Sequence, residues 1–245
     1  MGEYTQSEYD DTCKSIESGL QKVQDNPGDG FRVDFLSRAY RNLAEQELMW
    51  NEDVEAARIA LSGAGQVVID YYGRASEEDA DSPFGILPPC VNDAILAQLA
   101  GQHFTEAKYL SELGLGTSDR RARAEVDFDE LLLPLLAHVV LDDAEDASER
   151  RKLFRRAANK ENEFGFFTCL DALFERDAKR LSAGLSQVEL RHQKGLRSYS
   201  ARYVGETFSW AGTAFYNLGD HFGMPITHKF PSDNLADDLL LPTPE

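Results

Sequence analysis

The sequence has few of the residues from which covalent cross-links, membrane spans and export signals are built. It contains three cysteines, which lie far apart and form neither a CxxC pair nor a disulfide framework with every thiol paired: Cys13, Cys90 and Cys169. No uninterrupted apolar run approaches the roughly 20 residues that span a bilayer. The start MGEYTQSEYDD is acidic where a signal peptide has a basic and then an apolar segment. We therefore expect reduced thiols and a cytoplasmic protein.

Motifs for catalysis and cofactor binding are missing as well. The sequence has no GxSxG or SxxK nucleophile motif and no GKS or GKT phosphate-binding motif. Gly114 and Gly116 follow a predicted helix rather than a strand, which argues against a nucleotide-binding loop. We therefore expect no enzyme activity and no cofactor.

Positive charge is also in short supply. Lys and Arg total 25 against 43 Asp and Glu, so the formal net charge is -18. A field of this sign repels nucleic acid and anionic membranes, and we expect neither as a partner. Two interpretations of the acidity remain open. It is either an adaptation of the whole surface to high salt, or an acidic patch that neutralises one basic protein partner.

The sequence is rich in apolar residues that recur at the three- and four-residue spacing of helices. Hydrophobic residues make up 42% of the 245 positions, enough for a packed core. We expect one all-α domain over residues 1–245, with possible halves 1–72 and 88–245 joined by an acidic loop, 73–87. The run NPGDG at 26–30 ends a first helix, and LGLGTSDRRA at 113–122 is expected to break a later one.

Two apolar stripes define the first helices, and a polar pair marks the start of the third. The first stripe is Cys13, Ile16, Leu20 and Val23, and the second begins Phe31, Phe35, Ala39 and Leu43. Asn51 or Asp53 then caps a third helix.

Four short polar turns separate apolar helices with the same layout. They are NED at 51–53, GQHF at 101–104, DDAED at 142–146 and ERD at 175–177. Short turns between helices of this length force antiparallel hairpins. The repetition predicts an irregular stack of helical hairpins of tetratricopeptide-like or α-solenoid-like character. A helix rich in small and aromatic residues, with Trp210 and Phe215 buried, and a short extended segment near 224–230 complete it.

A few side chains leave a second class of function open. His103 and Glu106 form an HxxE pair, and His138 lies in an apolar helix, so a helical enzyme or a metal- or ligand-binding protein could assemble a site from them. One such pair does not make a metal site, and we expect no bound metal and His138 in the core. The basic helix face that contains Arg151 and Arg155 is expected to stabilise its own helix through the dipole.

Acidic turns are the candidate binding surface. If the chain binds a basic protein, carboxylates in two turns should raise the association rate, and one nearby aromatic should slow release. The candidate partner-binding residues are Glu77, Glu78, Asp79, Asp81 and Phe84 in one turn, and Asp142, Asp143 and Asp146 in the other.

The C-terminal third resembles a known family. A helix of small and aromatic residues is followed by GMPIT, then Pro231, then the pair Leu239 and Leu240. This pattern, from Trp210 to Leu240, resembles the ending of the immunity protein 49 family of bacteria and archaea. The resemblance implies an all-helical cytoplasmic chain that neutralises a toxin encoded beside it, here a toxin domain that we expect to be basic.

If the acidity is an adaptation to salt, stability should rise steeply with ionic strength. Repulsion among the excess carboxylates is screened as salt increases, so the folded state should gain more than an ordinary domain does. Melting temperatures in low and in molar potassium chloride test this. Equal midpoints would favour the binding-patch interpretation instead.

Overall fold

Helices make up the part of the chain that the structure describes. The computed structural model describes residues 5–74, 88–118, 128–143, 151–155, 164–198, 209–227 and 239. Within these ranges there is no strand, and the predicted all-α fold is confirmed. None of the described helices has both the length and the hydropathy of a bilayer-crossing segment. The elements are α1 (Gln6–Asp25), α2 (Gly30–Gln46), the π-helical turn η1 (Glu47–Asn51), α3 (Val54–Arg74), α5 (Pro88–Ala100), α6 (Phe104–Ser118), α7 (Phe128–Val140), α9 (Phe164–Glu175), α10 (Ala178–Ser198) and α11 (Trp210–His221).

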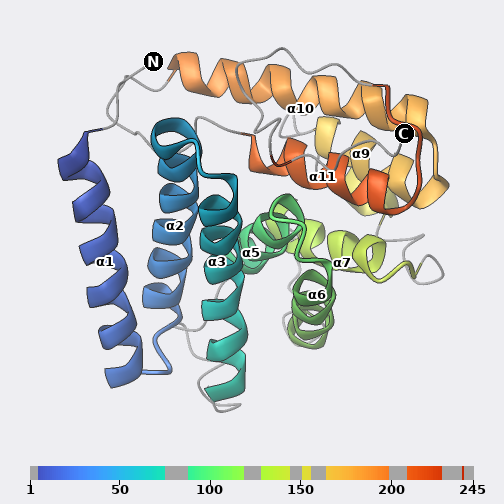
Figure 1. The fold of residues 1–245 in the computed structure, drawn as a ribbon. Coiled ribbons are helices and arrows are strands. Elements are labelled where there is room, and N and C mark those ends of the chain that lie inside the picture. The colour runs from blue at the N-terminus through green and yellow to red at the C-terminus, as the bar shows by residue number, and fades with distance from the viewer. Residues whose placement is uncertain are drawn as a thin grey trace.

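Helices α1, α2 and α3 lie side by side as one layer (Figure 1). Thr5 starts α1 with a capping box, in which it exchanges hydrogen bonds with Glu8. Asp29 and Asp53 accept hydrogen bonds from amides three residues later, at the starts of α2 and α3. Of the two caps expected for the third helix, the structure uses Asp53.

Helix α5 lies at the centre of the packing between the first layer and helices α6, α7 and α11. This helix contacts α3, α6, α7 and α11, and also touches α2. Helices α9 and α10 form a hairpin that lies against α11 (Figure 1). Buried apolar side chains from Ile16 in α1 to Leu239 form one continuous cluster.

The four polar turns share a backbone conformation. Each contains a non-glycine residue with a positive φ angle: 51° at Glu52, 65° at Gln102, 57° at Asp142 and 55° at Arg176. In the last three turns the next amide donates to the carbonyl five residues before it, over 2.8–2.9 Å, as in a Schellman motif. The repeated helix–turn layout seen in the sequence is therefore a repeat of local structure.

Helix α11 is buried along most of its length. Trp210 and Phe215 are in the core as predicted, and the Phe215 ring meets the Phe166 ring edge-on at 5.6 Å. The Asn217 amide donates to the carbonyls of Leu99 and Ala100 at the end of α5. In a strict solenoid each repeat touches only its neighbours. Here the last described helix returns to the middle of the stack.

Helix α2 buries a different face from the one expected. The predicted stripe is wrong at its start, because Phe31 is 74% exposed and Phe35 is 56% exposed. Val33 and Leu36 take the core positions instead and have no exposed surface. Because α2 is apolar on more than one side, residue spacing alone did not identify the face that meets its neighbours.

Two further segments differ from expectation. Helix α6 continues through Gly114 to Ser118, so the chain does not break at the start of LGLGTSDRRA. A Cβ on Gly114 would lie 2.9 Å from Leu133 Cδ1, so this glycine serves close packing against α7. Residues 224–227 are neither helix nor strand, and the Ile226 amide turns back to the Met224 carbonyl at 2.8 Å. The rest of the expected extended segment, 228–230, lies outside the described residues.

Phe215→Ala should destabilise the fold strongly, because the Phe215 ring has no exposed surface. We expect the free energy of unfolding to fall by about 3–5 kcal/mol. The matched change Phe31→Ala, at an exposed ring, should alter it by less than about 0.5 kcal/mol. Urea titrations of both variants measure the difference, and equal losses would contradict the burial described here.

Candidate functional site

Two phenylalanines of α2 lie on the surface although they are large and apolar. Phe31 and Phe35 are one helical turn apart and therefore face the same side. Moving a Phe side chain from water into an apolar environment is worth about 1.5–3 kcal/mol. Covering both rings would therefore stabilise a complex, and the pair marks this side of α2 as a place where an apolar surface can bind.

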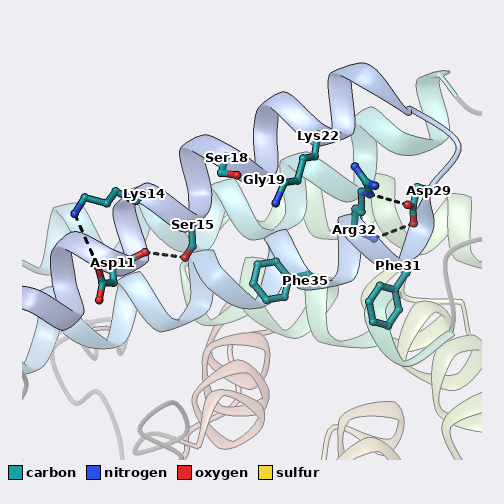
Figure 2. A pocket seen from close by; sticks show the side chains of 10 residues that line it. All are labelled: Asp11, Lys14, Ser15, Ser18, Gly19, Lys22, Asp29, Phe31, Arg32 and Phe35. Atoms are coloured by element: carbon teal, nitrogen blue, oxygen red, sulfur yellow. Dashed lines mark hydrogen bonds and ion pairs between the residues drawn. The ribbon is translucent and has the colours of Figure 1, made fainter.

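An open groove of about 720 Å³ lies between α1 and α2 beside these rings (Figure 2). This is within the usual range of binding pockets, about 300–1,000 Å³. The α1 residues are three and four positions apart, so they share one helix face. The lining comprises Asp11, Lys14, Ser15, Ser18, Gly19 and Lys22 from α1, and Asp29, Phe31, Arg32 and Phe35 from α2 and its N-cap.

Three of the α1 residues that line the groove are small: Ser15, Ser18 and Gly19. Gly19 is buried against α2, where a Cβ would lie only 3.0 Å from Leu36 Cδ1. The Ser15 hydroxyl turns back to donate to the Asp11 carbonyl of its own helix, over 2.7 Å. Ser18, the third small residue, carries a side chain of only two heavy atoms. No long side chain fills the space between the two helices at these positions.

The charges of the groove are not fully balanced by one another. Asp29 pairs with Arg32 Nε at 2.8 Å, and Asp11 lies 3.9 Å from the Lys14 ammonium. No ion pair or hydrogen bond joins the Lys22 side chain to another residue that the structure describes. Figure 2 shows this side chain extending from α1 toward α2. Among the described residues, Lys22 is therefore a positive charge of the groove without an ion pair, within a chain of net charge -18.

A polar contact fastens the other end of α1. The Tyr9 hydroxyl donates to Glu47 Oε1 over 2.6 Å, and the Asn51 amide donates to Glu47 Oε2 at the same distance. The hydrogen bond to Glu47, followed by burial, raises the pKa of Tyr9. The Gln46 amide adds a hydrogen bond to the Thr12 hydroxyl at 3.0 Å. These contacts hold the two helices that form the groove walls.

The acidic turn after α7 carries part of the binding surface expected from the sequence. Asp142 is exposed and pairs with Arg176, and Asp143 lies 3.6 Å from the buried ring of His138. Both carboxylates therefore have partners within the chain. The other candidates, Glu77, Glu78, Asp79, Asp81, Phe84 and Asp146, lie outside the described residues.

The histidines considered as ligands lie in ordinary packing environments. The His103 ring Nε2 is 3.0 Å from the Arg58 carbonyl oxygen, at the turn before α6. His138 is buried in α7, as expected. Among the described residues, no group of three His, Cys, Asp or Glu side chains is arranged to hold a metal ion. The structure therefore does not join His103, Glu106 and His138 into such a group.

The basic residues near 151–155 contact a neighbouring helix. Arg151 pairs with Asp171 and, over 2.8 Å, with Glu175, both on α9. Arg180 of α10 pairs with the same two carboxylates. Arg151 and Arg180 thus link three helical segments, which is a structural role beyond the dipole effect expected from the sequence.

The three thiols are poor nucleophiles. Burial raises the pKa of Cys169 and, with Asp34 and Asp93, that of Cys90. Cys13 is partly exposed, and its pKa is raised chiefly by burial, against a lowering hydrogen bond from Tyr9. A catalytic cysteine needs the opposite shift, since the thiolate is the reactive form.

No family model, curated protein or solved structure matches this chain.

A thiol-specific reagent should distinguish the three cysteines. In the folded protein only Cys13 should react, and slowly, because Cys90 and Cys169 are buried. Cys13→Ser should remove that phase and leave two thiols that react after denaturation. Mass mapping of the labelled sites checks this, and fast labelling of Cys169 in the folded protein would contradict it.

Proposed function

We propose that this chain is a non-enzymatic protein-binding module whose contact surface is the groove between α1 and α2. The observation that carries the proposal is the exposure of Phe31 and Phe35 beside that groove. Aromatic side chains are enriched in protein interfaces, where a few well-packed residues supply most of the binding energy. A partner that covers both rings removes apolar surface from water on both sides.

The preformed walls of the groove support this proposal. Helix α1 is tied to the end of α2 by the Tyr9–Glu47 and Gln46–Thr12 hydrogen bonds, and Gly19 packs closely on Leu36. A surface that is already ordered loses little conformational entropy when it binds. The shape of the groove therefore favours binding of a structured partner.

We further propose that the partner is a toxin domain, which the chain neutralises by direct binding in the cytoplasm. The resemblance of residues 210–240 to the immunity protein 49 family supports this, as does the net charge of -18, which attracts a basic domain. The surplus of Asp and Glu over Lys and Arg supplies that attraction. The buried free thiols of Cys90 and Cys169 suit a reducing compartment.

The test compares three immobilised baits: the unaltered chain, Phe31→Ser with Phe35→Ser, and Ile59→Ser. Ile59 lies on α3 and is 64% exposed, so it controls for loss of an exposed apolar side chain elsewhere. A partner captured from the source cells should be retained by the first and third baits. Its affinity for the double variant should fall at least about tenfold, as for interface hot spots.

Equal affinity for the double variant would remove the groove from the interface. The captured protein is then expressed in a growth assay, where the unaltered chain should restore growth and the double variant should not. A captured protein that does not inhibit growth would overturn toxin neutralisation while leaving the binding role intact.

A further inference from the structure

We infer that the element of the partner that fills the groove is an amphipathic helix, which sets apolar side chains on Phe31 and Phe35 and a carboxylate beside Lys22. This inference rests on the proposed function of the groove and specifies the chemistry of what binds there. Its basis is the shape of the groove and the charge that remains after its internal ion pairs are formed.

The shape of the groove fits a helix. Its α1 wall runs from Asp11 to Lys22, which is about 16 Å of helix at ~1.5 Å per residue. The central residues of this wall are small, and the opposite wall carries two rings one turn apart. An amphipathic helix lies in such a groove through apolar side chains at three- and four-residue spacing. A third helix packed across α1 and α2 also continues the packing already used between the helices of this protein.

The charge of the groove favours an acidic residue at the edge of the bound helix. Asp11 and Asp29 already have cations beside them on their own helices, whereas Lys22 has no acidic partner among the residues that the structure describes. A carboxylate on the bound helix would pair with Lys22 at the rim. A second cation there would meet an uncompensated charge, and like charges brought together at an interface disfavour binding.

Other occupants fit less well. A second copy of the chain would bring two molecules of net charge -18 together, and the field of each repels the other.

The overall charge of the partner and the charge of its binding helix act at different stages. The total charge raises the rate of encounter, and the groove fixes the final position of the bound helix. The partner we infer is therefore basic overall, with a locally acidic binding helix.

The probe is a library of helical hairpins displayed on phage, with one helix face randomised and selected against the unaltered chain. We expect enriched faces to combine apolar residues three or four positions apart with Asp or Glu at one edge. Individual binders should lose at least about tenfold in affinity against Phe31→Ser with Phe35→Ser. Lys22→Glu should weaken them about two- to five-fold, the usual size for an exposed ion pair. Lys179→Glu, at an exposed lysine of α10, should have no effect and is the matched control.

The outcomes separate this inference from the proposed contact surface. Binders that need the phenylalanines but carry Lys or Arg at the edge, or ignore Lys22→Glu, overturn the inferred chemistry and leave the surface standing. Binders unaffected by the phenylalanine double variant overturn both. A selection that enriches no helix overturns the helical occupant. A dimer in light scattering that the double variant dissociates assigns the groove to a second copy instead.

Discussion

The Asn217 side chain joins the last described helix, α11, to α5 in the middle of the helical stack. Its amide donates to the carbonyls of Leu99 and Ala100, which end α5, and to the carbonyl of Leu239, at 3.1–3.2 Å. The last carbonyls of a helix have no partner within it, and in a buried position they must find one elsewhere. Asn217 has no exposed surface, so these hydrogen bonds form away from water. Helix α11 is therefore held against α5 by a polar contact as well as by packing.

Because α5 and α11 form the centre, α1 lies at an edge. Helix α5 contacts four other helices extensively, whereas α1 packs chiefly on α2 and buries only Ile16, Gly19 and Val23. Terminal repeats of stacked helical proteins usually end in a polar face. Here the edge hairpin instead exposes Phe31 and Phe35 beside a groove. The packing at the centre of the fold accounts for its stability. The exposed phenylalanines at its edge, where a polar face is usual, suggest a binding role.

Features determined by local chemistry could be read from the sequence. The four polar turns, the cap at Asp53 and the helix stop at NPGDG depend on residues within a few positions of one another, and the structure contains all of them. The burial of Trp210 and Phe215 follows from large apolar rings among small residues. The groove depends on long-range packing, because the face that α2 buries is decided by where α1 and α3 dock. Gly114 shows the same limit, since its role in α6 is set by Leu133 of α7.

One sequence signal could have located the groove before the structure was known. Ser15, Ser18 and Gly19 put three small residues on one face of α1, an otherwise charged helix, and this face lines the groove. The apolar spacing of α2 does not decide by itself which face of this helix is buried. Taken together with the small residues of α1, the spacing is compatible with a second prediction, in which Val33 and Leu36 are buried and Phe31 and Phe35 are exposed.

The distribution of charge gives Lys22 its significance. Several arginines of the described chain are used internally: Arg41 pairs with Asp93, Arg176 with Asp142, and Arg151 and Arg180 with Asp171. Such pairs cancel part of the positive charge where it stands, so the field felt at a distance is dominated by the surplus of carboxylates. Lys22 forms no ion pair with another described residue, so its charge is available to a partner. At this position the charge lies beside exposed aromatic rings and an open groove, which together offer a partner a charge and an apolar anchor at one place.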